Sequence, residues 1–94
     1  MALVSRSVRV ANRLGLHARA AAKFVHLASR FESHVKVTRG AQTVDGKSIM
    51  GILLLAAATG TVLTVATDGA DEQAALDALC GFIQTGFGED TCSG

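Results

Sequence analysis

The chain has 94 residues, of which 49% are hydrophobic, and its formal net charge at pH 7 is +1. This length supports one hydrophobic core and is too short for two independent ones. The composition contains no Trp, Tyr or Pro. Ala, Val and Leu must therefore build the core, which argues against an aromatic-lined ligand pocket. We expect one domain over residues 1–94, with a frayed tail over about 86–94.

The first half of the chain predicts a strand, a helix and a hairpin. Alternation over Val4–Val10 predicts the first strand. Over Ala18–Phe31 the apolar residues recur at helical spacing. Alternation around Val35 and Val37 predicts a second strand, and Gly40 turns the chain into a short third one at residues 42–44. The polar face of the predicted helix is basic and carries Arg19, Lys23, His26 and Arg30.

The second half predicts helix, strand and helix. Ser48 begins a helix that continues to about Ala58, and Gly60 is placed to end it. Thr61–Thr67 favours a fourth strand, and a last helix follows over about Asp71–Thr85. The buried stripe of that helix is predicted to contain Leu76, Leu79, Cys80 and Ile83.

The order β-α-β-β-α-β-α predicts an α+β fold. We expect a two-layer open-faced sandwich, in which a four-stranded antiparallel sheet carries three helices on one face. Residues 48–67 contain no charge over about the length of a bilayer span. The run is divided at Thr59–Thr61, where a helical pattern changes to a strand pattern. A soluble domain is therefore expected, without membrane insertion.

The two cysteines predict no disulfide framework. Cys80 lies among apolar positions, and Cys92 lies in a Ser/Gly-flanked tail. One buried and one exposed free thiol fit a reducing compartment. The N-terminus has no signal-peptide pattern, and we expect a cytoplasmic protein.

Charge is divided unevenly along the chain. All nine Lys and Arg residues lie in residues 1–47, whereas residues 48–94 hold six of the eight carboxylates and no Lys or Arg. A nearly neutral chain can thus present a basic face to a phosphate group or an acidic partner. A small nucleic-acid-binding domain is a second hypothesis from the same basic half. No aromatic side chains interleave with the cations for base stacking, and we expect no nucleic-acid partner.

The segment Gly15–Arg19 places a glycine, a histidine and an arginine at the start of the first predicted helix. A helix N-terminus offers unpaired backbone N–H groups and a positive dipole, which favour an anion. The same field disfavours imidazolium, so His17 is expected to be neutral and nucleophilic near pH 7. Neutral imidazole can attack phosphorus, and Arg19 can neutralise the bound group. From spacing alone, a capping or solvated histidine is the favoured interpretation.

Three segments carry a resemblance to a known family. Residues 14–21, LGLHARAA, resemble the active-site segment of the HPr phosphocarriers of the bacterial phosphoenolpyruvate-dependent phosphotransferase system. Residues 47–51, KSIMG, are similar to the regulatory-serine segment of the same family, at the expected distance downstream. The ending at residues 86–90, GFGED, resembles proteobacterial and nitrogen-branch members. The likeness covers nearly the whole chain and agrees with the predicted order of elements.

The resemblance implies a role for each matching residue. His17 matches the histidine that phosphoenolpyruvate-charged enzyme I phosphorylates on Nδ1, and that passes the group to an EIIA-type acceptor of sugar transport. Arg19 matches the arginine that balances the phosphoryl charge. Ser48 matches the serine that an ATP-dependent HPr kinase modifies in many bacteria. The apolar docking patch of the family matches Ile49, Met50 and Leu53.

Structural roles compete with some of these assignments. Ser48 precedes an apolar helical run and is a favoured N-cap. This role is compatible with modification, because a phosphate is electrostatically well placed there. The pattern alone places Leu54 and Leu55 in the core, and the docking assignment of the patch rests on the resemblance. Ala20 stands where most family members have Pro, which a first helical turn tolerates. We expect little loss of chemistry from this difference.

The resemblance implies a stoichiometric carrier rather than an enzyme. The sequence contains no Walker motif or metal-binding carboxylate set, so we expect no cofactor, ATP or metal of its own. A monomer is expected. The alternative is a regulatory binding module of a nitrogen-type phosphotransferase branch, which signals through its phosphorylation state. The sequence leaves the choice of branch, and thus the phosphoryl recipient, open.

Overall fold

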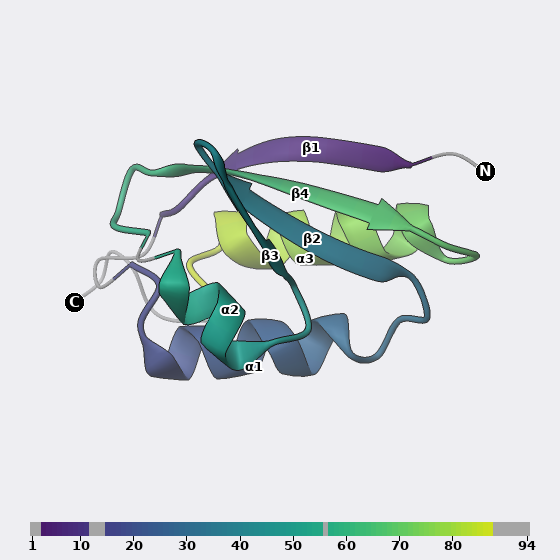
Figure 1. The fold of residues 1–94 in the computed structure, drawn as a ribbon, viewed down its shortest axis with the longest axis horizontal. Helices are drawn as coiled ribbons and strands as arrows, with labels where there is room; N and C mark the ends of the chain where they lie inside the picture. The colour runs from purple at the N-terminus through teal and green to yellow at the C-terminus, as the bar shows by residue number, and fades with distance from the viewer. Residues whose placement is uncertain (1–2, 12–14, 56, 88–94) are drawn as a thin grey trace.

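The computed structural model describes residues 3–11, 15–55 and 57–87 and shows two layers (Figure 1). Its elements confirm the predicted order. They are β1 (Val4–Arg9), α1 (Ala18–Ala28), β2 (His34–Arg39), β3 (Gln42–Asp45), α2 (Ile49–Leu54), β4 (Val62–Asp68) and α3 (Glu72–Gln84).

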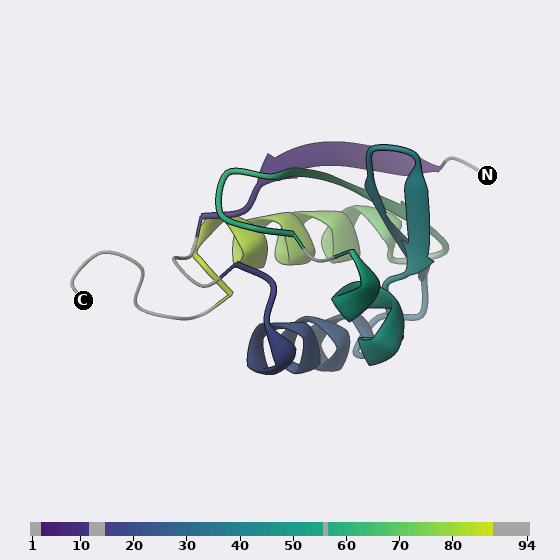
Figure 2. The same cartoon turned by 60° about the vertical axis from the view of Figure 1, so that its left-hand side comes forward.

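The four strands form one antiparallel sheet in the order β1-β4-β2-β3. Figures 1 and 2 show all three helices on the same side of this sheet, which confirms the predicted open-faced sandwich. The other face is uncovered by the described helices. A row of hydroxyl side chains crosses all four strands there, set by the strand register: Ser7, Thr64, Thr38 and Thr43.

The core lies between the sheet and the helices, as the alternating patterns predict. The two central strands, β2 and β4, bury alternate residues, whereas β1 buries only Val8 and β3 buries none. Helix α3 buries the predicted stripe together with Ala75. Cys80 is fully buried, and this burial raises the pKa of its thiol. Among the described residues, no helix is long and apolar enough to cross a bilayer.

The second helix is shorter than predicted. It ends at Leu54, whereas the pattern predicted a helix to about Ala58. Leu54 is 63% exposed, so its predicted place in the core is wrong, while Leu55 is fully buried as expected. After the helix ends, the carbonyls of Leu55 and Ala57 accept from the Arg39 side chain and the Leu16 N–H. Gly60 lies beyond the helix, at positive φ in the turn into β4.

The expected fraying from residue 86 is wrong for the first two residues. The N–H of Gly86 donates to the Ile83 carbonyl, and the N–H of Phe87 donates to the Phe82 carbonyl. This pair of bonds is a Schellman motif, which closes the last turn of a helix. The ring of Phe87 is fully buried and meets the ring of Phe82 edge to face. Residues 88–94, including Cys92, lie outside the described residues.

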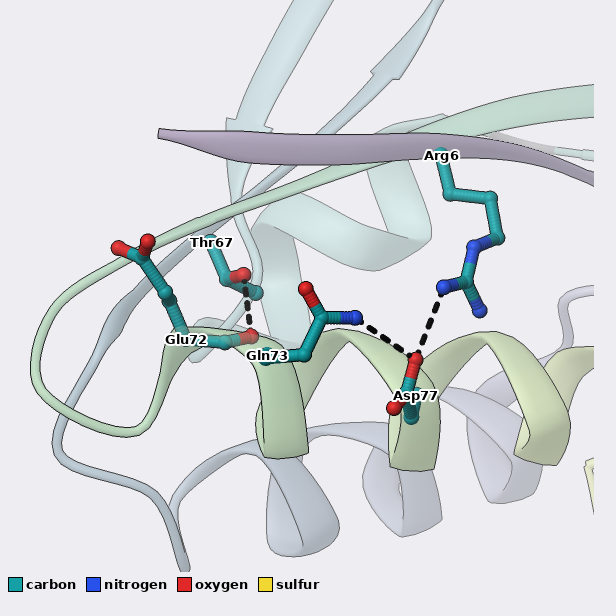
Figure 3. A network of polar contacts seen from close by, with 5 residues as sticks. All are labelled: Arg6, Thr67, Glu72, Gln73 and Asp77. Atoms are coloured by element: carbon teal, nitrogen blue, oxygen red, sulfur yellow. Dashed lines mark hydrogen bonds and ion pairs between the residues drawn. The ribbon is translucent and has the colours of Figure 1, made fainter. Parts of the chain in front are cut away.

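Polar contacts fix α3 against the sheet (Figure 3). Asp77 accepts from Arg6 at 2.8 Å and from Gln73 at 3.0 Å. The hydroxyl of Thr67 donates to the Glu72 carbonyl at 2.7 Å. These contacts join β1 and β4 to the first turns of α3, so the helix cannot slide along the sheet without breaking them.

Asp71, the residue before α3, connects the two loops at the far end of the sheet. Its Oδ2 accepts from the backbone N–H of Glu32, and its Oδ1 accepts from both the N–H and the hydroxyl of Ser33. The Ser33 hydroxyl, followed by the Glu32 N–H, holds the pKa of the Asp71 carboxyl below its ordinary value. All three bonds are strongest when the carboxyl is ionised.

Replacing Asp71 with Asn should lower the stability of the fold at neutral pH and weaken its dependence on acid. A carboxyl with a depressed folded-state pKa stabilises the fold above the ordinary Asp pKa of about 3.9, and this contribution disappears as the pH falls through the lower value. Urea unfolding from pH 7 to pH 2 measures both effects. Ser33→Ala, which removes the largest cause of the shift, should lie between the wild type and Asp71→Asn. Identical pH profiles for the three proteins would contradict this assignment.

Candidate functional site at the start of α1

His17 is the N-cap residue of α1. Its backbone is extended, with φ −93° and ψ 178°, and its side chain makes no capping hydrogen bond to the first turn. The first intrahelical bond runs from the N–H of Ala21 to the His17 carbonyl, at 2.8 Å. The N–H groups of residues 18–20 precede this bond and have no intrahelical acceptor. The first turn contains no acidic residue, so no carboxylate of the helix itself competes with an anion at this end.

The loop before His17 rests on the segment that follows α2. The N–H of Leu16 donates to the Ala57 carbonyl at 2.8 Å, and the N–H of His17 donates to the Gly15 carbonyl at 3.1 Å. Gly15 has φ +68°, and a Cβ on it would lie 2.6 Å from the Ala57 oxygen. Only glycine fits this position without strain. Leu14, which belongs to the matching motif, lies outside the described residues.

The imidazole of His17 is partly buried. Its Nε2 atom has almost no solvent-accessible surface, so an incoming group cannot reach the ring through this nitrogen. The other ring nitrogen, Nδ1, is the atom that the resemblance implies as the phosphoryl acceptor.

The predicted basic face of α1 is exposed. Arg19, two residues after His17, is the cation nearest to it in sequence, and Lys23 and His26 follow along the same helix. Arg30 lies in the turn after α1, which ends at Ala28 rather than at the predicted Phe31. The exposed residues of this face are Arg19, Lys23, His26 and Arg30. A negatively charged group or protein approaching His17 therefore meets positive charge along the whole of α1.

Ser48 has the predicted N-cap geometry at the start of α2. Its hydroxyl accepts from the N–H of Gly51 at 3.1 Å, and its backbone is extended. The side chain is partly buried. The structural role inferred from the sequence is thus confirmed, and the hydroxyl lies at a helix terminus where a phosphate would be favoured.

An exposed apolar patch lies on α2, which packs beside α1 (Figure 1). Ile49 is 43% exposed, Met50 69% and Leu54 63%, whereas Leu53 is partly buried and packs against the core. We refer to Ile49, Met50 and Leu54 as the α2 patch. The sequence analysis missed Leu54, although its i+4 spacing from Met50 places both residues on one helix face.

Within the described residues, no group of three or more His, Cys, Asp or Glu side chains is arranged to hold a metal ion. The chemistry available at the start of α1 is that of an imidazole, backbone N–H groups and an arginine.

Comparisons with known proteins agree with this arrangement. Residues 4–85 match the family model described as the PTS HPr component phosphorylation site. The chain belongs to the HPr family of phosphotransferase-system phosphocarriers. The family suggested by the sequence motifs is thereby confirmed.

Individual relatives cover nearly the whole chain. The phosphocarrier protein HPr of Cupriavidus necator is 51% identical over 93% of this chain and 98% of its own length. The phosphocarrier protein NPr of Shewanella violacea is 38% identical over 95% and 98%, respectively. The crystal structure of the HPr of Bacillus anthracis has a TM-score of 0.86 at 43% identity, over 89% of this chain and 100% of that one.

Gly15→Ala should destabilise the fold more than Gly40→Ala does. Both glycines have a similar positive φ, but a Cβ at Gly40 meets nothing within 4 Å, whereas one at Gly15 meets the Ala57 carbonyl. Strain at positive φ alone costs about 1–2 kcal/mol for a residue with a Cβ. We expect this loss for Gly40→Ala and roughly twice as much for Gly15→Ala, measured by urea unfolding. Equal losses would show that the close contact with Ala57 does not constrain the loop.

Proposed function

We propose that this chain accepts a phosphoryl group from enzyme I on Nδ1 of His17 and passes it to an EIIA-type acceptor of the sugar phosphotransferase system. The group originates in phosphoenolpyruvate. One observation carries the proposal: His17 is the N-cap of α1, and its side chain makes no capping hydrogen bond to the first-turn N–H groups. A phosphoryl group attached to this ring would be close to those donors and to the positive end of the helix.

The transfer needs no group beyond those of the two proteins. The Nδ1 lone pair attacks phosphorus, an N–P bond forms, and the bond between phosphorus and enzyme I breaks with its electron pair left on enzyme I. The first-turn N–H groups and the guanidinium of Arg19 stabilise the charge on the phosphoryl oxygens. Attack by the acceptor then breaks the N–P bond and restores neutral His17. The chain acts as a stoichiometric carrier with a covalent intermediate.

The surface around His17 supports docking of acidic partners with an apolar centre. The α2 patch belongs to a helix that packs against α1, and α1 carries exposed cations. A partner that covers both helices would combine apolar contact with electrostatic attraction. We propose Ile49, Met50 and Leu53 as docking residues. Leu53 is partly buried, so we expect it to support the exposed side chains of Ile49 and Met50 rather than contact a partner. Leu54 supplies the third exposed apolar side chain.

Modification of Ser48 by an HPr kinase would act on this docking surface. A phosphate adds about 1.5 to 2 negative charges at pH 7, next to Ile49 and Met50. The N-cap position accommodates this charge without unfolding α2. The added charge opposes docking by repelling an acidic enzyme I surface and by resisting desolvation.

We propose that this carrier acts in the cytoplasm as a monomer. The alternative is a regulatory module of a nitrogen-type branch. The higher identity to the HPr of C. necator than to the NPr of S. violacea favours the sugar branch.

Incubation with enzyme I and ³²P-labelled phosphoenolpyruvate should label the wild type and leave His17→Ala unlabelled. The label should be acid-labile and base-stable, as a bond from phosphorus to a histidine nitrogen is. His26→Ala is the matched control, because His26 is an exposed histidine on the same helix, and it should be labelled like the wild type. Absence of label on the wild type with active enzyme I would end the proposal.

Ser48→Asp should slow phosphoryl transfer from enzyme I by about tenfold or more, because a charge at the docking surface weakens association. Ser48→Ala removes the N-cap and should cost about 1 kcal/mol of stability while keeping most of the transfer rate. Stopped-time transfer assays and thermal unfolding of both variants separate the two effects. An unchanged rate for Ser48→Asp would refute the electrostatic mechanism.

A further inference from the structure

A guanidinium from the sheet holds the C-terminal end of α2. Arg39, the last residue of β2, donates from Nη1 to the Leu55 carbonyl at 2.7 Å. Leu55 is the C-cap of α2 and is fully buried. A helix C-terminus favours positive charge, yet α2 has no basic residue in its last turn, and residues 48–94 contain no Lys or Arg. The charge at this terminus therefore comes from the first half of the chain.

The backbone that follows Leu55 supports the loop at Gly15 and Leu16, which precedes His17. Ala57, two residues after Leu55, accepts the N–H of Leu16 at 2.8 Å. Ala57 and Ala58 also form the surface against which Gly15 packs without room for a Cβ. A shift of residues 55–58 would consequently move the backbone on which His17 rests. The same segment begins directly after Leu54, one of the three residues of the α2 patch.

We propose that Arg39 is a positioning residue for phosphoryl transfer. By fixing the Leu55 carbonyl, it holds both the end of the α2 patch and the segment that supports the His17 loop. The docking surface and the acceptor imidazole are thus kept in one relative position. Arg39 touches neither the phosphoryl group nor His17, and it acts through backbone hydrogen bonds. The effect on transfer rests on the proposed function, whereas the effect on the loop does not.

A purely local role makes a different prediction. If Arg39 only caps α2, its loss would loosen residues near Leu55 and leave the Leu16 N–H as protected as before. If Arg39 positions the loop, the bond from Leu16 to Ala57 should open more often. Amide hydrogen exchange at Leu16 reads this bond directly, without enzyme I or any phosphoryl chemistry.

The test compares Arg39→Met, Arg39→Lys and Arg6→Met in the full chain. Arg6→Met is the matched control, because Arg6 also donates a charged hydrogen bond from the sheet to a helix, but at α3. Arg39→Met should speed exchange at Leu16 by about tenfold, as expected for losing a charged hydrogen bond. Arg39→Lys keeps one donor and should lie between. Arg6→Met should leave Leu16 unchanged. Circular dichroism confirms that each variant is folded.

Transfer from enzyme I is then measured as a function of carrier concentration. Arg39→Met should lower the turnover at saturation as well as raise KM, since both the imidazole and the patch lose their support. Unchanged exchange at Leu16 would overturn the positioning role. Faster exchange with normal transfer would overturn its part in the reaction. Faster exchange in a chain that is never phosphorylated would support the loop contact and overturn the proposed function instead.

Discussion

The close approach of Gly15 to residues 57 and 58 is the constraint on which the site depends. A side chain at position 15 would collide with a backbone carbonyl, and the neighbouring Leu16 N–H uses that same carbonyl as its acceptor. The chain leaving β1 is thereby pressed onto the chain leaving α2 before it starts α1. His17 thus caps its helix with an extended backbone and makes no side-chain bond to the first turn. The chemistry of one histidine is in this way set by contacts between segments about 40 residues apart in sequence.

The basic first half and the acidic second half of the chain contact each other in the folded structure. The acidic half needs cations that it does not contain, and the basic half provides them across the layers. Arg39 reaches the end of α2, and Arg6 reaches Asp77 on α3. Arg9 and Lys47 likewise donate to the Gly60 and Phe31 carbonyls, whereas Arg19 and Lys23 on α1 stay exposed. The uneven distribution of basic and acidic residues along the chain therefore has two uses. It supplies hydrogen bonds between the sheet and the helices, and it leaves cations exposed for charged partners.

Much of this architecture follows from the sequence alone, because each strand alternates and each long helix has a clear apolar stripe. The N-cap roles of His17 and Ser48 were also predictable, since caps depend on a few neighbouring residues. The end of α2 could not be predicted in this way. The carbonyls of Leu55 and Ala57, which follow the helix, accept from Arg39 and Leu16, and both donors are distant in sequence. For the same reason the exposure of Leu54 escaped a pattern that contains four consecutive apolar residues. The burial of Phe87 was not predicted either. A Schellman turn depends on the chain geometry after the helix, where the composition resembles that of a loose tail.

The bare face of the sheet gives the molecule a second side that takes no part in this chemistry. Its row of Ser and Thr hydroxyls lies opposite the layer of helices that carries the acceptor histidine and the α2 patch. A fluorophore or a surface linker attached at Thr64 would thus leave the whole helical side accessible. The fold is suited to immobilisation in one orientation, with every molecule presenting the same end to its partners.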